Sequence, residues 1–151
     1  MSSRSLRGYA AFAEMPAPSG VLWSWLTDPS LLRRWYAESV ELAPRAGGRF
    51  TARLADGTTF IARVGLAEPA RRLRLDFESL PAWPGPACIT EDWIIDARPE
   101  KVVLRVIGEG VPAGPEWGPW LRLAQSRWTV NLARLKRLLL PAPSLPAGGP
   151  R

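Results

Sequence analysis

The side chains able to carry chemistry are few in this sequence. Histidine is absent, Cys88 is the only cysteine and Asn131 is the only asparagine. The absence of histidine excludes Ser-His-Asp and Cys-His catalytic sites, and one cysteine cannot build a cysteine zinc site. We therefore expect no metal site and no cofactor. The acid–base candidates that remain are carboxyl groups.

Glu91 is the carboxyl group that the sequence pattern singles out. Alternation over 88–96 places it on the same face of a predicted strand as Trp93 and Ile95. A carboxylate on a buried face must find a partner, or its pKa is raised. Three interpretations stay open: a ligand contact or general acid, a buried ion pair with an arginine such as Arg122, and a carboxylate that reaches solvent at the end of a cavity.

A long helix has to cover this face. Apolar residues recur at steps of three and four from Trp117 onward, and Pro119 and Pro141 suit the two ends, which predicts a helix over 119–140. The predicted apolar stripe consists of Trp117, Leu121, Ala124, Trp128, Leu132, Leu135 and Leu139. A helix with one such face needs a sheet to pack on.

Short segments with a period of two precede this helix. The pattern predicts a strand over 5–14, two short helices through 19–26 and from Asp28 onward, and six further strands. These strands cover 38–43, 49–54, 58–67, 71–78, 88–96 and 101–108. The short connections favour an antiparallel meander. A loop over 97–100 predicts Asp92 opposite Arg105 and Trp93 opposite Leu104.

The composition is typical of one globular domain, with 151 residues, 46% apolar residues and a net charge of +6. No apolar run is long enough for a membrane span and no leader is recognisable, so we expect a cytoplasmic protein without a membrane partner. The basic residues alternate with acids and match no nucleic-acid motif, so we expect no nucleic-acid partner. We expect one domain over 1–140 and a disordered Pro/Gly-rich tail over 141–151.

Four stretches resemble one superfamily. Leu22-Trp23 through Leu26-Thr27-Asp28-Pro29 to Trp35 is similar to its apolar-Trp, Leu-Thr-Asp-Pro and Trp signature. Pro44 to Phe50 resembles its Pro-x-Gly-Gly-x-Phe turn, and Glu68-Pro69 with Arg72-Leu73 matches its next turn. Trp128, Leu132, Leu135 and Lys136 resemble its helix pattern Trp-x-x-x-Leu-x-x-Leu-Lys. The superfamily is the START-like, or SRPBCC, group, and its closest branch contains homologues of the activator of the ninety-kilodalton heat-shock protein ATPase.

The resemblance implies an α+β helix-grip fold, in which a curved antiparallel sheet of about seven strands wraps around a long C-terminal helix and two short helices follow the first strand. It also implies a cavity between sheet and helix that often takes apolar small molecules, but no shared catalytic motif. We expect aromatic residues of the strands and of the Pro-rich loops, the asparagine and Glu91 to contact a ligand there. The predicted set is Phe77, Trp83, Glu91, Trp93, Trp117, Trp120 and Asn131. One departure from the family pattern is Arg127, which stands where glycine usually precedes the helix tryptophan.

The favoured function is therefore binding of a hydrophobic or amphipathic molecule, lipid-like or polycyclic, for transport, sensing or sequestration by a monomer or homodimer. We favour a non-enzymatic role and leave open a cyclase- or aromatase-like enzyme that uses the Glu91 carboxyl. A co-chaperone-like protein-binding module is the third alternative. An enzyme should show two or more polar groups that converge in the cavity, a carrier one or none, and a protein-binding module an exposed apolar patch.

Overall fold

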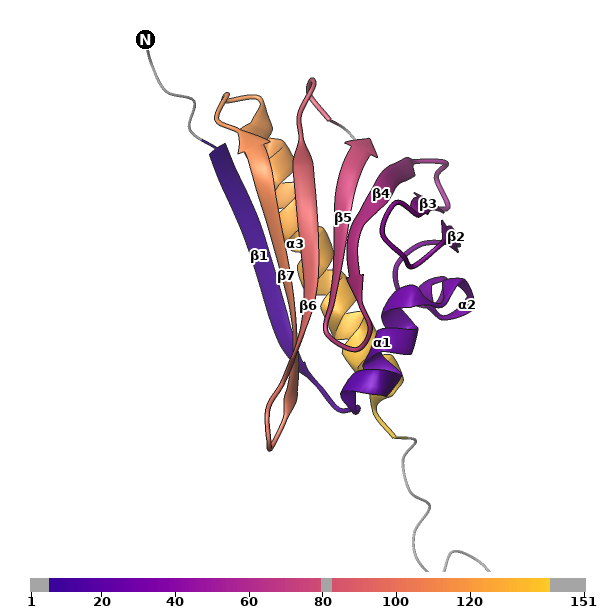
Figure 1. Ribbon diagram of the computed structural model, residues 1–151. Helices are drawn as coiled ribbons and strands as arrows, with labels where there is room; N and C mark the ends of the chain where they lie inside the picture. The colour runs from indigo at the N-terminus through magenta and orange to yellow at the C-terminus, as the bar shows by residue number, and fades with distance from the viewer. Residues whose placement is uncertain (1–5, 80–82, 142–151) are drawn as a thin grey trace, which may run out of the picture.

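The computed structural model describes residues 6–79 and 83–141. Within these residues, seven strands and three helices form the predicted α+β helix-grip fold (Figure 1). In chain order the elements are β1 (Leu6–Met15), α1 (Ser19–Thr27), α2 (Pro29–Leu32), β2 (Ser39–Leu42), β3 (Arg49–Arg53), β4 (Thr59–Glu68), β5 (Arg72–Ser79), β6 (Ile89–Ala97), β7 (Val102–Pro112) and α3 (Trp117–Leu139). Two bounds differ clearly from the prediction, because β7 continues to Pro112 and α3 already begins at Trp117.

The strands form one antiparallel sheet in the order β1-β7-β6-β5-β4-β3-β2. Register shifts between β4 and β5 mark β-bulges, which bend a sheet locally. In Figure 1, α3 runs along one face of the sheet, behind β7 and β6, while α1 and α2 lie beside β2. The curved sheet therefore holds α3 against its concave face.

The two short helices are separated by a single capping residue. The Asp28 side chain accepts a hydrogen bond from the backbone N–H of Ser30 at 2.9 Å, and Pro29 is the first residue of α2. Just after α2, the guanidinium of Arg134 in α3 donates to the carbonyl oxygen of Trp35 at 3.1 Å. This contact holds the segment after α2, which carries Tyr36, against α3.

Helix α3 also covers part of the free edge of the sheet. β1 is an edge strand, and the side chain of Gln125 bonds both backbone groups of Ala10. Its amide nitrogen donates to the Ala10 carbonyl at 2.6 Å, and its amide oxygen accepts from the Ala10 N–H at 3.3 Å. Unpaired strand edges favour pairing with another chain, so Gln125 protects this edge near the middle of β1.

The core between sheet and helix is aromatic. The rings of Trp93 and Trp128 lie 5.4 Å apart, and the ring of Tyr36 lies 5.4 Å from Trp93 and 5.8 Å from Trp128. The buried residues of α3 are Trp117, Trp120, Ala124, Trp128, Asn131, Leu132 and Leu135. The predicted stripe is therefore slightly rotated, because Trp120 and Asn131 replace Leu121 and Leu139 on the buried face.

The predicted register of the last two strands is wrong by two residues. Trp93 lies opposite Val106 and not opposite Leu104. The reason is the turn, which runs over 98–101, one residue later than predicted, and is closed by backbone bonds between its first and last residues. Because the shift is an even number of residues, every side chain keeps the predicted face of the sheet.

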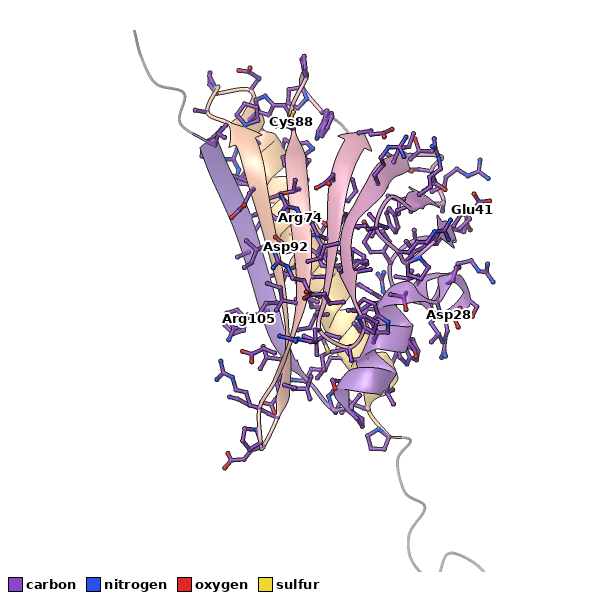
Figure 2. The ribbon with its side chains drawn as sticks, in the orientation of Figure 1. Asp28, Glu41, Arg74, Cys88, Asp92 and Arg105 are labelled. Carbon is purple, nitrogen blue, oxygen red and sulfur yellow. The ribbon has the colours of Figure 1, made fainter. Side chains whose placement is uncertain are left out.

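The convex face shows the consequence of this shift. Asp92 pairs with Arg72 of β5 at 2.9 Å instead of with Arg105, which lies 3.4 Å from Asp96. Figure 2 shows Arg74, Asp92 and Arg105 on the face turned toward the viewer, opposite α3. Charged side chains thus occupy the convex face of the central strands, while the concave face is mainly apolar, with Glu91 as its charged residue on β6.

Two further predictions concern the ends of the domain and the membrane. All but the first residue of the predicted tail over 141–151 lies outside the described residues. Among the described residues, no helix has the length and apolar character needed to cross a membrane.

Candidate functional site

Glu91 lies in the middle of the concave face. Its side chain is 0% exposed, although its neighbour Asp92 points to the viewer-facing side in Figure 2. Successive residues of a strand point to opposite faces, so Glu91 projects toward α3, as the alternation predicted. A carboxyl group at this depth requires hydrogen-bond donors around it.

Three aromatic side chains supply these donors. The indole N–H of Trp93 donates to Oε1 of Glu91 at 3.1 Å, and the indole N–H of Trp128 donates to Oε2 at 3.0 Å. The hydroxyl of Tyr9 also donates to Oε2. The carboxylate is therefore fixed by groups from β1, β6 and α3, and each of these donors is itself buried.

A glycine makes the contact with Tyr9 possible. Tyr9, Gly108 and Glu91 occupy one row across β1, β7 and β6, because Gly108 is the register partner of both other residues. A Cβ atom on Gly108 would lie 2.1 Å from Cζ of Tyr9, closer than any non-bonded carbon contact. The missing side chain at this position therefore lets the tyrosine ring cross β7 to reach Glu91.

Arg127 supplies the opposite charge. Its Nη2 lies 3.9 Å from Oε2 of Glu91, which is close enough for an ion pair but too long for a hydrogen bond. Its guanidinium also lies over the ring of Phe60, with Cζ 4.8 Å from the ring centre. The side chain is 23% exposed, so it connects the buried carboxylate with the surface. The ion-pair partner is thus Arg127 and not Arg122, which was the arginine named from the sequence.

The two tyrosines near Glu91 remain protonated over a wide pH range. Burial, followed by the negative charge of Glu91, raises the pKa of Tyr9 well above its ordinary value. The same two causes raise the pKa of Tyr36, which is 4% exposed. Both residues are therefore neutral hydroxyl donors at neutral pH.

Several buried donors on α3 and in the segment after α2 lack a hydrogen-bond partner. Within the described part of the chain, no hydrogen-bond partner is present for the Tyr36 hydroxyl, for Nε and Nη2 of Arg127, or for Nδ2 of Asn131. Tyr36 and Arg127 both contact Phe60, since the rings of Tyr36 and Phe60 lie 5.6 Å apart. Asn131 follows Arg127 by one turn of α3, which places the two side chains on one side of the helix. These three residues define the donor cluster.

The other predicted ligand contacts fall into two groups. Phe77 and Trp93 belong to the enclosed core, where the ring of Phe50 lies 6.3 Å from Phe77 and 6.2 Å from Trp93. Trp83, Trp117 and Trp120 form a chain of rings at one end of α3, with centroid separations of 6.2 and 5.3 Å, and Trp120 continues it to Tyr9 at 5.9 Å.

The structure therefore links the loop tryptophans to the centre of the site through Tyr9. A pocket of about 660 Å³ opens beside the same loops, between residues 86–88 and 110–114, with Cys88 in its lining. Figure 2 shows Cys88 at that end of the sheet. In the part of the chain that the structure describes, no group of three carboxylate or cysteine side chains is placed to hold a metal ion.

Sequence reasoning missed four members of the site, namely Tyr9, Tyr36, Arg127 and Trp128 as a donor. Two signals pointed to Tyr9 and Arg127. Gly108 follows Val106 and Ile107 within β7, and a glycine inside a strand is a mark of close approach by another group. Arg127 replaces the glycine usual in the family pattern, and this departure lies directly beside the buried carboxylate.

Comparison with known proteins agrees with this architecture. The family model described as Activator of Hsp90 ATPase homolog 1-like protein matches residues 16–140. No protein with a curated description matches the sequence.

Solved structures share the fold at low sequence identity. Protein MLL2253 from Mesorhizobium loti has a TM-score of 0.78 and 22% identity, over 88% of this chain and 96% of that one. The Aha1 dimer from Colwellia psychrerythraea has a TM-score of 0.72 and 16% identity, over 88% and 96% of the two chains. DynU16, a protein of the dynemicin biosynthetic locus, has a TM-score of 0.72 and 25% identity, over 87% of this chain but only 46% of that one.

Proposed function

We propose, from the premise that this chain belongs to the family of Activator of Hsp90 ATPase homolog 1-like proteins, that it binds a hydrophobic or amphipathic small molecule between the sheet and α3. Transport, sensing or sequestration of that molecule is the function we favour. The resemblance to solved structures supports the fold, and the argument for a ligand comes from the donor cluster of Tyr36, Arg127 and Asn131.

The observation that carries this proposal is the set of buried donors without partners. A folded protein normally pairs its buried polar groups, because each unpaired group costs about 1–3 kcal/mol. Tyr36 and Arg127 both contact the ring of Phe60, and Asn131 lies one helical turn after Arg127. A bound molecule with a polar atom at this position accounts for them, and the surrounding rings provide apolar walls.

Gentle purification followed by mass spectrometry tests the proposal. The protein is kept free of detergent and organic solvent, measured under native conditions, and then extracted so that any retained small molecule can be identified. We expect an apolar or amphipathic compound in a fixed ratio to the protein. Added aromatic probes should also quench the fluorescence of the buried tryptophans, because several of these rings surround the donor cluster.

A blocking variant makes this experiment specific. Ala52 is 3% exposed and is the register partner of Phe60, so its side chain lies beside Phe60 on the concave face. Ala52→Leu fills space next to the donor cluster and should reduce ligand retention. Ala133→Leu makes the same change on the exposed face of α3 and should leave retention unchanged. If the wild-type protein neither retains nor takes up any apolar molecule, the proposal is wrong.

An enzyme remains the second candidate, because more than two polar groups converge on the site. A phenol that donates to a carboxylate, as Tyr9 does to Glu91, can in principle move a proton. The full enclosure of Glu91 and its three donors favours an electrostatic role instead. A reaction of the retained compound that is lost in Glu91→Gln, with binding preserved, would establish the enzyme.

The oligomeric state belongs to the same proposal. One relative of this fold is described as a dimer, the Aha1 protein from Colwellia psychrerythraea. We retain both a monomer and a homodimer as possible carriers of the ligand, in the cytoplasm. Neither state changes the site, because all the residues named above come from one chain.

A further inference from the structure

We propose, on the basis of the function above, that the donor cluster of Tyr36, Arg127 and Asn131 selects a neutral aromatic molecule that carries a carbonyl oxygen, and rejects the matching carboxylate.

The hydrogen-bonding groups of the cluster determine whether the ligand atom that they bind is a donor or an acceptor. The guanidinium nitrogens of Arg127 and the amide nitrogen of Asn131 are donors only, and the Tyr36 hydroxyl also has a proton to donate. The Tyr36 hydroxyl, Nε and Nη2 of Arg127 and Nδ2 of Asn131 lack hydrogen-bond partners among the described residues, although Nη2 also faces Glu91 as an ion pair. The group that completes the site is therefore a hydrogen-bond acceptor, such as a carbonyl, and not a second donor.

The surroundings of the cluster fix the shape of the molecule. Phe60 is 1% exposed and contacts both Tyr36 and Arg127. The ring of Tyr36 also lies 5.8 Å from that of Trp128, so flat aromatic surfaces border the donors. Flat rings make offset-stacked and edge-to-face contacts with such walls at these separations. An aromatic ligand fits this region better than a flexible aliphatic chain.

The charges decide between a carbonyl and a carboxylate. Arg127 already faces Glu91 at 3.9 Å, and together these two side chains carry no net charge. A ligand carboxylate on the donor cluster would give this enclosed region a second negative charge opposite one cation. Like charges in a poorly solvated site disfavour each other strongly. A neutral acceptor uses the same donors without this repulsion.

Arg127 is the member of the cluster that extends to the surface. Its side chain is 23% exposed, whereas Glu91 is fully enclosed, and the unpaired Nε and Nη2 atoms of Arg127 are buried. Entry of a carbonyl oxygen therefore requires the Arg127 side chain to move. Glu91 then acts as a positioning residue that sets the charge of the site, not as a group that touches the ligand.

Three probes with the same ring system test the inference at neutral pH. Naphthalene has no acceptor, acetonaphthone has a neutral carbonyl, and naphthoate is an anion. Binding is measured from quenching of tryptophan fluorescence. We expect acetonaphthone to bind about three- to tenfold tighter than naphthalene, as one or two net hydrogen bonds give, and naphthoate to bind at least about tenfold more weakly than acetonaphthone.

The two tyrosines of the chain provide matched variants. Tyr36→Phe removes an unpartnered hydroxyl, so acetonaphthone should lose most of its advantage over naphthalene while naphthalene binding stays unchanged. Tyr9→Phe removes a hydroxyl that already donates a hydrogen bond to Glu91. The ratio of the acetonaphthone and naphthalene affinities should therefore stay within about twofold of the wild-type ratio. Circular dichroism of each variant confirms that it is folded.

The possible failures are distinct. If naphthalene and acetonaphthone bind equally, or if naphthoate binds as tightly as acetonaphthone, the inference is overturned while the proposed function survives. If Tyr9→Phe and Tyr36→Phe change the affinity ratio equally, the donor cluster is not the selecting element. If no probe binds, both the inference and the proposed function are wrong.

Discussion

Replacement of Glu91 by glutamine tests whether the buried carboxylate is a structural centre of this core. The side chain keeps its size but loses its charge. Its amide nitrogen must replace one of two oxygens, and both of these oxygens accept hydrogen bonds from ring donors. The least disruptive orientation puts the amide nitrogen beside Trp93, which leaves that indole N–H without an acceptor. Tyr9 and Trp128 can then still donate to the remaining oxygen.

Two effects set the expected magnitude. A buried donor without a partner costs about 1–3 kcal/mol. Removal of one member of a buried ion pair costs about 3–5 kcal/mol in fully enclosed pairs. The second figure applies only in part, because Arg127 is 23% exposed and can turn toward solvent. We expect Glu91→Gln to lower the free energy of unfolding by about 2–4 kcal/mol, which leaves a domain of ordinary stability folded.

Urea unfolding followed by tryptophan fluorescence measures this change. The matched control is Glu109→Gln, which makes the same chemical change on an exposed residue of β7, and it should alter the free energy of unfolding by less than about 0.5 kcal/mol. The slope of the transition should stay constant, so that a shifted midpoint reports stability. A loss for Glu91→Gln as small as that of the control would refute the structural role derived for this carboxylate.

Four further outcomes follow from the same geometry. Tyr9→Phe breaks a hydrogen bond to a charged group and should cost about 1.5–3 kcal/mol in urea unfolding, whereas Tyr36→Phe removes an unpaired buried hydroxyl and should raise the free energy of unfolding by up to about 1–3 kcal/mol. The raised pKa values of both tyrosines mean that the folded state holds protons that the unfolded state releases above about pH 10, so stability should be complete below that pH and fall above it, less steeply in Tyr36→Phe. Gly108→Ala forces the Tyr9 ring away from Glu91 and should destabilise at least as much as Tyr9→Phe, although alanine suits a strand better than glycine. Gln125→Leu uncovers the backbone of Ala10 at the sheet edge and should increase association with protein concentration in analytical ultracentrifugation, and an unchanged sedimentation profile would contradict this.

The sequence was sufficient for the architecture and for the face of the sheet on which Glu91 lies. Alternation along a strand is a local property, so it placed Glu91 and Trp93 on the concave face even though the register with the next strand was wrong by two residues. Asp92 illustrates the limit, because its true partner, Arg72, depends on where a turn closes. When the turn lies one residue later, every residue has a different partner on the neighbouring strand, but each side chain stays on the same face of the sheet.

The partners of Glu91 could not be found in the same way. Tyr9 reaches it across a third strand, and that contact depends on the order of strands in the sheet and on the space above Gly108. The choice between Arg122 and Arg127 depends on how α3 is placed along the sheet as well as on its rotation, because residues five positions apart differ by about 7.5 Å along a helix and by about 140° around it. Helical periodicity fixes the rotation of a helix only roughly, which also explains why the predicted apolar stripe did not include Asn131, although it lies on the buried face.

The polar groups of the site are explained better by ligand binding than by a contribution to the stability of the fold. A buried ion pair is often no better for stability than apolar residues of the same volume. Stability alone therefore does not explain why Glu91 and Arg127 are present in this core. The unpartnered groups of Tyr36 and Asn131 add further cost to the ligand-free fold. A molecule that binds only the folded state and supplies an acceptor offsets this cost by mass action, and its contribution grows with its concentration. The same groups that weaken the empty core therefore become the source of affinity and selectivity when a carbonyl oxygen lies among them.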